Sequence, residues 1–380
     1  MDCGRSPRAR NPRELTATPS TFGKYPTLTM GVEEELMIVD PATLDLFPGV
    51  QRIRARAESY DLPGPVKTEL HASIFELNTP PCATAHEAAA SLTALRRGIA
   101  EVVAAEGLAF AAAGCHPFAR ALDQEIVDDE RYQHFVGWAG VSAQRQGVQG
   151  LHVHLSMPDG ETCWGVLEGM LQWLPVILAL SANSPWFEGV QNGVHSNRAE
   201  ILLDLPRTGA PPPCGSYAGW EAWANRLIAL GIFEDATRLW WDVRPNPHLG
   251  TVEVRIADQQ TDVRRSAALA ALIQALAATI IEAGPSGDVD PSRRGDYHHN
   301  RWAASHYGPL ATLIHPEGNR IATAAELGAE LLAFVAPAAT ALGSSDLLAI
   351  INPDVCEADL QTVLSTPHEV AADLVARSLA

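Results

Sequence analysis

Three consecutive carboxylates interrupt a segment that otherwise has the composition of a buried strand, GVEEELMIVD (31–40). Successive side chains of a strand point to opposite faces. Glu33 and Glu35 therefore share one face, and Glu34 lies on the other face among apolar neighbours. An unpaired buried carboxylate is costly. We expect Glu33 and Glu35 to share a cationic site, and Glu34 to meet an Arg, a Lys or a backbone donor beneath the sheet, or to lie near an exposed edge.

Three further segments, GLHVHLS, GTVEVRIAD and KTELHASIFELNTP, also place charged or polar side chains together. In the first two, strand alternation gives each pair a shared face: His152 with His154, and Glu253 with Arg255. In the third, Glu69 and Glu76 flank a tight turn across which the chain could pair. One such strand ordinarily forms a solvated sheet face. Together on one sheet, the four segments predict a cluster of carboxylates, imidazoles and a guanidinium.

This mixture of side chains favours metal-dependent phosphoryl chemistry. Carboxylates at close range repel and raise one another's pKa, and a divalent cation relieves that repulsion. Mg²⁺ and Mn²⁺ prefer oxygen ligands, and an imidazole suits Mn²⁺ better than Mg²⁺. An arginine beside such a cluster suits a phosphate or a carboxylate. The sequence contains no GxxxxGK[ST], GxGxxG or HExxH motif, so a nucleotide would not be bound by a P-loop or Rossmann site.

The elements that must position these residues indicate an α+β fold, because strands come early and helices cluster late. Apolar alternation predicts strands near 28–39, 66–71, 73–79, 108–113, 149–157 and 250–257. Helical apolar spacing predicts helices near 84–106, 163–182, 219–231, 261–283, 323–341 and 357–378. Thr84 begins a capping-box pattern for the first of these helices.

Composition narrows the class of protein. The 380 residues carry a formal net charge of −18, which disfavours a general nucleic-acid or anionic-membrane binder. The six cysteines are scattered without a CxxC pair, which argues against a disulfide framework or a zinc–thiolate site and fits a cytoplasmic protein. We find no apolar run approaching the roughly 20 residues of a membrane span. Residues 1–25 have the composition of a disordered tail without a secretory signal, and 26–380 are expected to form a single catalytic domain.

The motifs, taken in order, resemble a known family. The matching stretches are GVEEELMIVD, KTELHASIFELNT, GCHPF, DDERYQ, GLHVHLS, LSANSPWFEG, WWDVRPNPHLGTVEVRIAD and NRWAASHYG. They resemble the carboxylate–amine ligases of the glutamate–cysteine ligase type 2 group, which are relatives of glutamate–cysteine ligase and glutamine synthetase. The resemblance implies a curved, mostly antiparallel sheet that forms an open, funnel-shaped active site with helices packed outside, as in the glutamine synthetase catalytic domain.

The resemblance also implies a ligand set. One metal would be held by Glu35, Glu69 and Glu76, and a second by Glu33, His152 and Glu253. Arg255 would neutralise the transferred phosphate, and His154 would lie near the substrate, either as a metal ligand or as a substrate contact. ATP would serve as a substrate and Mg²⁺ or Mn²⁺ as the cofactor.

Five further residues are candidate substrate or nucleotide contacts. Arg244 and His248 lie in the Pro-rich DVRPNPHLG segment, where Arg244 suits a carboxylate or a phosphate and could equally order the loop. Asn183 lies in SANSPWFEG, which could shape a substrate pocket or serve only the fold. Asn300 and Arg301, in NRW, carry the same two alternatives.

The predicted function is ATP-dependent amide formation between a carboxylate and an amine through an acyl phosphate, nominally from glutamate and cysteine. Two alternatives stay open. One is a phosphotransferase of the guanidino-kinase kind, and the other is a non-catalytic nucleotide- or amino-acid-binding protein. The expected partners are small molecules, with no nucleic acid or membrane, and the family suggests a homodimer.

Overall fold

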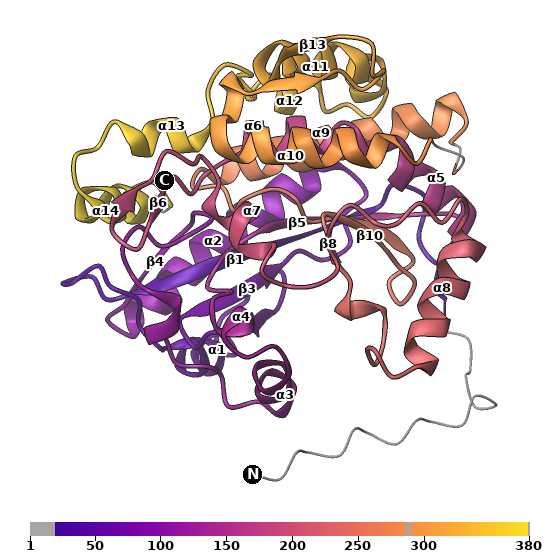
Figure 1. Ribbon diagram of the computed structural model, residues 1–380. Coiled ribbons are helices and arrows are strands. Elements are labelled where there is room, and N and C mark those ends of the chain that lie inside the picture. Colours follow the sequence, from indigo (N-terminus) through magenta and orange to yellow (C-terminus); the bar gives the residue numbers. More distant parts are fainter. Residues whose placement is uncertain (1–19, 286, 288–289, 379–380) are drawn as a thin grey trace.

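A computed structural model describes residues 20–285, 287 and 290–378. Most of the expected tail, residues 1–19, lies outside the described residues. Residues 20–25 are described, and they are attached to the body of the protein (Figure 1). The backbone N–H groups of Thr21 and Gly23 donate to the carbonyls of Pro247 and Met157, each at 2.9 Å. The predicted boundary at residue 25 therefore lies too far along the chain.

The central sheet has the strand order β10-β11-β5-β1-β3-β2, with β4 paired to β1, and every neighbouring pair is antiparallel. Its strands are β1 (Met30–Val39), β2 (Val66–Thr68), β3 (Ile74–Asn78), β4 (Ala109–Ala111), β5 (Leu151–Ser156), β10 (Val243–Asn246) and β11 (Thr251–Val254). The predicted α+β class and antiparallel sheet are confirmed. Short pairs complete the strands: β6 (Trp186–Phe187) with β7 (Val190–Gln191), β8 (Thr208–Gly209) with β9 (Trp240–Trp241), and β12 (Thr312–Ile314) with β13 (Ile321–Thr323).

The α-helices are α1 (Val50–Ala57), α2 (Ala85–Ala105), α3 (Glu130–Ala139), α4 (Val141–Gln144), α5 (Gly160–Leu171), α6 (Leu174–Ser181), α7 (Asn197–Leu202), α8 (Tyr217–Ala229), α9 (Val263–Ala283), α10 (Arg293–Tyr307), α11 (Ala324–Ala341), α12 (Ser345–Leu348), α13 (Glu357–Thr362) and α14 (Pro367–Ser378). The 3₁₀ turns are η2 (Ala121–Asp123), η3 (Ala236–Arg238) and η4 (Gly308–Leu310). Thr84 caps α2 as predicted, because its hydroxyl accepts from the N–H of Glu87 at 3.1 Å.

Two predicted helices are each broken in two. The segment expected as one helix over 163–182 bends by 62° between α5 and α6, where Pro175 stands in the first turn of α6. The segment expected over 357–378 divides into α13 and α14, and Pro367 begins the second helix. Proline cannot donate to the preceding turn of a helix and is favoured in the first turn of a new one.

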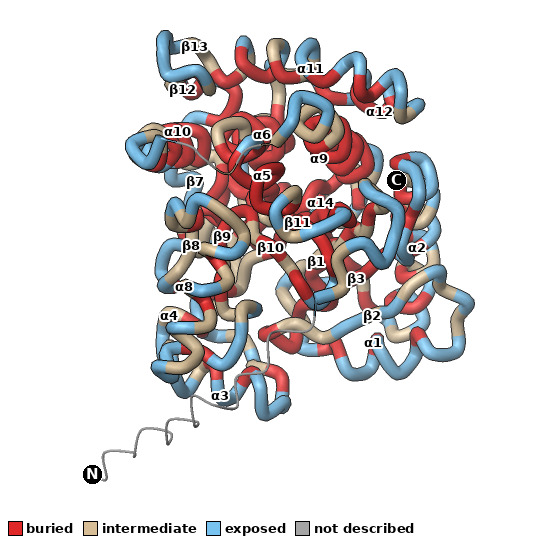
Figure 2. Tube along the Cα trace, turned by 90° about the vertical axis from the view of Figure 1, so that its right-hand side faces the viewer, coloured by how far each residue is buried: buried red, intermediate tan, exposed pale blue. Residues whose placement is uncertain are grey.

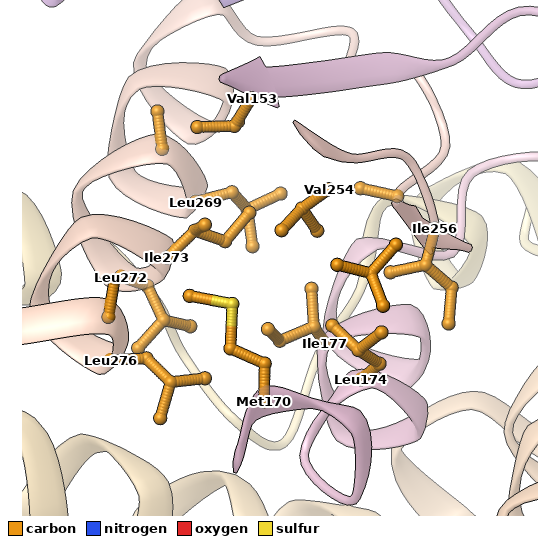
Figure 3. Packing of buried hydrophobic residues seen from close by; sticks show 14 of the residues in the cluster. Val153, Met170, Leu174, Ile177, Val254, Ile256, Leu269, Leu272, Ile273 and Leu276 are labelled. Carbon is orange, nitrogen blue, oxygen red and sulfur yellow. The ribbon is translucent and has the colours of Figure 1, made fainter. Parts of the chain in front are cut away.

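Helices cover one face of the sheet in layers. In Figure 1, α6, α9 and α10 lie above the strands, with α11 and α12 outside them. Figure 2 shows that α6 is buried and that α5 and α9 are buried along most of their middle turns. Figure 3 shows the contact from inside, where Val153 and Val254 of the sheet pack toward Leu269 of α9 and Ile177 of α6. This apolar layer holds the sheet from behind and leaves its other face free to carry polar groups.

Glu34 is the one carboxylate of the triplet that enters this apolar layer, and it is completely buried. The guanidinium of Arg96 on α2 donates to both of its oxygens at 2.7 and 2.8 Å. The hydroxyl of Ser266 and the amide of Gln259 donate at 2.6 and 2.8 Å. The prediction that Glu34 finds an arginine beneath the sheet is confirmed.

By length and composition alone, α9 and α11 could each cross a membrane, and the bent pair α5–α6 would pass the same test as a third segment. The expectation that no apolar run approaches a membrane span is therefore wrong for α9 and for α11. Two thirds of the apolar window of α9, 67%, is buried inside the protein. Its packing against α2, α5 and α11 accounts for its composition.

Candidate active site

Strand register brings the predicted chemical residues into rows on the face of the sheet opposite the helices. In β1, Glu33 pairs with His152 on one side, and Glu35 pairs with Glu76 on the other. Beyond β5, Glu253 pairs with His154, and Arg244 pairs with Glu253. An open cavity of about 1180 Å³ lies over this face. Its lining includes nine of the predicted residues: Glu33, Glu35, Glu69, Glu76, His152, His154, Arg244, Glu253 and Arg255.

Three of the carboxylates form a compact group. One oxygen from each of Glu35, Glu69 and Glu76 can be chosen so that all lie within 4.8 Å of one another. Burial, followed by repulsion from the neighbouring carboxylates, raises the pKa of Glu69 well above its usual value and also raises that of Glu76. Lys67 Nζ, at 3.1 Å from Glu76 Oε1, offsets part of this charge. An all-oxygen group of this kind suits a hard divalent cation.

A second group surrounds Glu33. His152 Nδ1 lies 3.4 Å and His154 Nε2 lies 3.5 Å from its two oxygens. Burial would raise the pKa of Glu33, but the two imidazoles outweigh burial and hold that pKa well below its usual value. Burial and the charge of Arg255 lower the pKa of His152 to about 4. His152 is therefore neutral at physiological pH, which is the form that binds a metal.

Glu253 is buried and is bound by cationic groups. Arg244 donates to its two oxygens at 2.8 and 3.0 Å, and Arg255 also contacts it. Burial acts to raise the pKa of Glu253, but the two guanidinium groups outweigh it and hold that pKa well below its usual range. Arg244 also donates to the carbonyls of Thr237 and Leu239 at 2.9 and 2.8 Å, so it orders the preceding loop.

The walls of the cavity come from segments outside the sheet. On one side, α3 contributes Tyr132, whose hydroxyl donates to the carbonyl of Thr68 at 2.7 Å. On the other side, the segment around η3 contributes Trp240, and its ring centroid lies 5.3 Å from that of Phe135 on α3. The hydrogen bond joins α3 to β2 and the aromatic contact joins α3 to β9, so α3 is held over the sheet from both sides.

Arg198 is a site residue that the sequence analysis missed. It lies in α7, is almost fully buried, and lines the cavity. Its guanidinium donates to the carbonyls of Ile256 at 3.1 Å and Arg255 at 2.9 Å, and its Nε atom has no hydrogen-bond partner among the described residues. Its sequence context, SNRAE, carries no alternation or motif, so only the tertiary structure reveals its position.

Comparisons with known proteins identify relatives of the chain. The family model for glutamate–cysteine ligase family 2 matches residues 29–355. A Rubrobacter xylanophilus protein provisionally named glutamate–cysteine ligase 2-3 is 38% identical over 343 residues, which covers 90% of each chain. A Herpetosiphon aurantiacus protein provisionally named glutamate–cysteine ligase 2 is 37% identical over 317 residues, covering 83% of this chain and 82% of that protein.

The chain belongs to the glutamate–cysteine ligase family 2. It is an ATP-dependent ligase of that family. Among solved structures, the glutamate–cysteine ligase of Francisella tularensis in complex with AMP superposes with a TM-score of 0.69 at 14% identity, over 94% of this chain and 89% of that one. A bifunctional glutathione synthetase from Pasteurella multocida gives 0.65 at 16% identity, over 93% of this chain and 51% of that one. These two likenesses establish a shared fold.

Four of the candidate contacts do not line the cavity of this family member. Asn183 is buried behind the sheet, where its amide donates to the carbonyl of Gln259 at 2.7 Å. Asn300 bridges to β12, donating to and accepting from the backbone of Ile314 at 2.7 Å. Both side chains have partners within the fold, so the structure gives them a packing role.

Arg301 and His248 are also placed elsewhere. Arg301 is buried and donates to Asp242 at 2.7 Å, and the hydroxyl of Tyr297 donates to the same carboxylate at 2.6 Å. His248 is exposed, and its backbone carbonyl accepts from the hydroxyl of Thr21 at 2.9 Å. Arg301 therefore has a structural role in place of the expected contact, whereas the side chain of His248 is not among the residues that line the cavity.

Proposed function

We propose that the protein activates a carboxylate with ATP as an acyl phosphate and then joins it to an amine, releasing ADP and phosphate. Glutamate and cysteine are the nominal substrates, in line with the names of the family and its relatives. The observation that carries this proposal is the row of carboxylates and guanidinium groups that strand register places on the cavity floor.

The donor groups on the floor fit divalent cations. Glu35, Glu69 and Glu76 offer an all-oxygen set, which suits Mg²⁺ or Mn²⁺. Glu33 and His152 would form a second, mixed set, which favours Mn²⁺ more than the first does. Glu253 lies in the same row but is already held by two guanidinium groups. Bound cations would supply charge neutralisation between an anionic carboxylate and the triphosphate.

The residues of the chain have separate roles in this scheme. Arg255 contacts Glu253 at the edge of the carboxylate cluster and would neutralise negative charge that develops on the transferred phosphate. Arg244, which holds Glu253, acts as a positioning residue. His154 has its Nδ1 at 3.0 Å from the hydroxyl of Thr251, which orients its ring, and it would serve either as a metal ligand or as a substrate contact. The walls formed by α3 and η3 would limit the access of water to a labile acyl phosphate.

Cationic side chains among the carboxylates of the cavity could each contact a carboxylate or phosphate of an anionic substrate. The chain has a formal net charge of −18, yet several cationic side chains line the cavity: Lys67, Arg131, Arg198, Arg238, Arg244 and Arg255. Because carboxylates outnumber these groups in the lining, bound cations would also be needed to offset the repulsion of an anionic substrate.

The test is ADP release from ATP with a panel of amino acids and amines, followed by detection of the amide. A ligase gives an amide with at least one pair, and glutamate with cysteine is the first pair to assay. Hydroxylamine distinguishes the phosphotransferase alternative, because it yields a hydroxamate only where an acyl phosphate forms. The absence of both hydroxamate and amide from folded, metal-loaded protein would contradict the proposal.

A further inference from the structure

A second group of metal-binding side chains lies outside the cavity. His195 stands in the loop between β7 and α7, whereas Cys356 caps the N-terminus of α13 and Asp359 lies in its first turn. One donor atom from each can be chosen so that all three lie within 4.8 Å of one another. None of the three is among the residues that line the acidic cavity.

Hydrogen bonds hold two of these side chains in a ligand-like orientation. His195 Nδ1 lies 2.9 Å from the carbonyl oxygen of His306, so Nδ1 carries the proton and Nε2 presents a lone pair. Metal-binding histidines are characteristically oriented in this way, with the second nitrogen donating to a carbonyl or a carboxylate. The Oδ2 atom of Asp359 accepts from the backbone N–H of Cys356 at 2.8 Å, which fixes the carboxylate.

The facing atoms require a positive charge between them. His195 Nε2 and Asp359 Oδ1 are 3.3 Å apart, and in the neutral ring both atoms are acceptors. Either a proton on Nε2 or a bound cation would remove the repulsion between these two acceptor atoms. A third donor, Cys356 Sγ, lies 3.3 Å from Asp359 Oδ2 and is buried. With a proton on Nε2, the histidine pairs with the carboxylate and the Cys356 thiol donates to Asp359 Oδ2, whereas a metal ion would replace both hydrogens and bind all three groups.

Asp359 lies 3.3 Å from His195 Nε2 through Oδ1 and 3.3 Å from Cys356 Sγ through Oδ2, and all three donors come within 4.8 Å of one another, so a small movement could form a tetrahedral zinc site. Zinc bonds of about 2.0–2.3 Å place two tetrahedral ligand atoms roughly 3.3–3.6 Å apart. Histidine, cysteine and aspartate are all zinc ligands, and a thiolate disfavours Mg²⁺. We infer that His195, Cys356 and Asp359 form a second metal site that binds a zinc-class divalent ion, with water as the fourth ligand.

A metal ion at this site would connect α13 to the loop before α7, a helix that contributes Arg198 to the cavity lining. The loop that carries His195 leads directly into α7, which carries Arg198. In Figure 1, α13 lies at the left-hand edge near β6, and the indole of Trp186 in β6 donates to the carbonyl of Gln361 at 3.4 Å. The absence of a CxxC pair argued against a zinc–thiolate site, but that test fails when the ligands come from segments far apart in sequence.

Cobalt(II) is the probe that separates this site from the cavity. A thiolate bound to Co²⁺ gives a charge-transfer absorption in the near ultraviolet, and no cysteine is among the residues that line the cavity. We expect metal-free, full-length protein to develop this band with about one equivalent of Co²⁺, and Zn²⁺ to abolish it. Cys356→Ser should remove the band. Cys214→Ser is the matched control, because Cys214 is only half-buried and lies outside the cluster.

His195→Gln provides an independent variant, because Cys356→Ser changes a buried helix cap. Loss of this ligand should weaken Co²⁺ binding at least tenfold, with an unchanged circular dichroism spectrum. The inference is overturned if the wild-type protein gives no band, if Cys356→Ser keeps it, or if Cys214→Ser removes it to the same extent. Equal Co²⁺ affinity in folded His195→Gln protein would also overturn it.

Discussion

Replacing Glu69 by glutamine should stabilise the protein in the absence of metal. Glu69 shares its site with Glu35 and Glu76, with all three oxygens within 4.8 Å. Without a cation, these carboxylates repel and are partly desolvated, which raises the pKa of Glu69 well above its usual value. Glutamine keeps the shape of the side chain, removes its charge and replaces one acceptor oxygen by an NH2 donor that can bond to a neighbouring carboxylate.

The size of the stabilisation can be calculated from the distance between the carboxylate oxygens. Two unit charges 4.8 Å apart interact by about 3.5 kcal/mol at an effective dielectric constant of 20. The Glu69 side chain can take up a proton, which relieves part of this repulsion. We therefore expect Glu69→Gln to raise the free energy of unfolding by about 1.5–2 kcal/mol at pH 8 in EDTA.

The pH dependence has a definite sign. When the pKa of a carboxyl is higher in the folded protein than in the unfolded chain, the folded protein binds more protons. The stability contributed by Glu69 is then fully present below its unfolded pKa and is lost as the pH rises through its folded pKa. The wild-type protein in EDTA should therefore lose stability above about pH 4.5, and Glu69→Gln should lose less.

Chemical denaturation at several pH values, with and without Mg²⁺, measures the stabilisation by Glu69→Gln and its pH dependence. Mg²⁺ should stabilise the wild-type protein and have a much smaller effect on Glu69→Gln, because one ligand has been lost. Glu101→Gln, at an exposed position on α2, is the matched control and should follow the wild type. The electrostatic reasoning would be refuted if Glu69→Gln in EDTA were no more stable than the control at pH 8.

Three further substitutions separate structural from chemical roles. Glu34→Leu should lower the free energy of unfolding by about 3–5 kcal/mol, because it leaves the buried Arg96 unpaired. A double variant that also carries Arg96→Leu should recover most of this stability, and no recovery would contradict the pairing. Arg301→Ala should lower the free energy of unfolding by a similar amount and leave the KM for ATP at the wild-type value. A raised KM would instead support the nucleotide contact that the sequence suggested for Arg301. Arg255→Ala should lower kcat by about 10²–10³-fold in folded protein, and unchanged turnover would exclude its proposed role.

The floor of the cavity was predictable because strand alternation is a local property. Residues two apart on a strand share a face whatever the rest of the fold does, so Glu33 with Glu35 and His152 with His154 could be paired from the sequence. Strand β10 was missed because Pro245 weakens its strand pattern. Its position at the end of the sheet, beside β11 alone, explains why a proline is tolerated there.

The remaining assignments depended on contacts between distant segments. Asn300 and Arg301 look like ligand contacts in isolation, but the backbone of β12 and the carboxylate of Asp242 satisfy them. Arg198 enters the site from α7, and nothing in its neighbouring residues marks it. Local patterns thus indicate which side chains share a face, whereas the partners of a buried polar group are decided by tertiary packing.

The division between floor and walls has a consequence for how selectivity could change. The acidic floor is fixed by hydrogen-bonded register on the central strands. The walls, in contrast, come from α3 and the segment around η3, both outside the central sheet. Substitutions in these walls can reshape the opening of the cavity without moving the carboxylates and arginines of the sheet. The same set of sheet residues could in this way serve a range of acceptors, with side-chain replacements confined to peripheral segments.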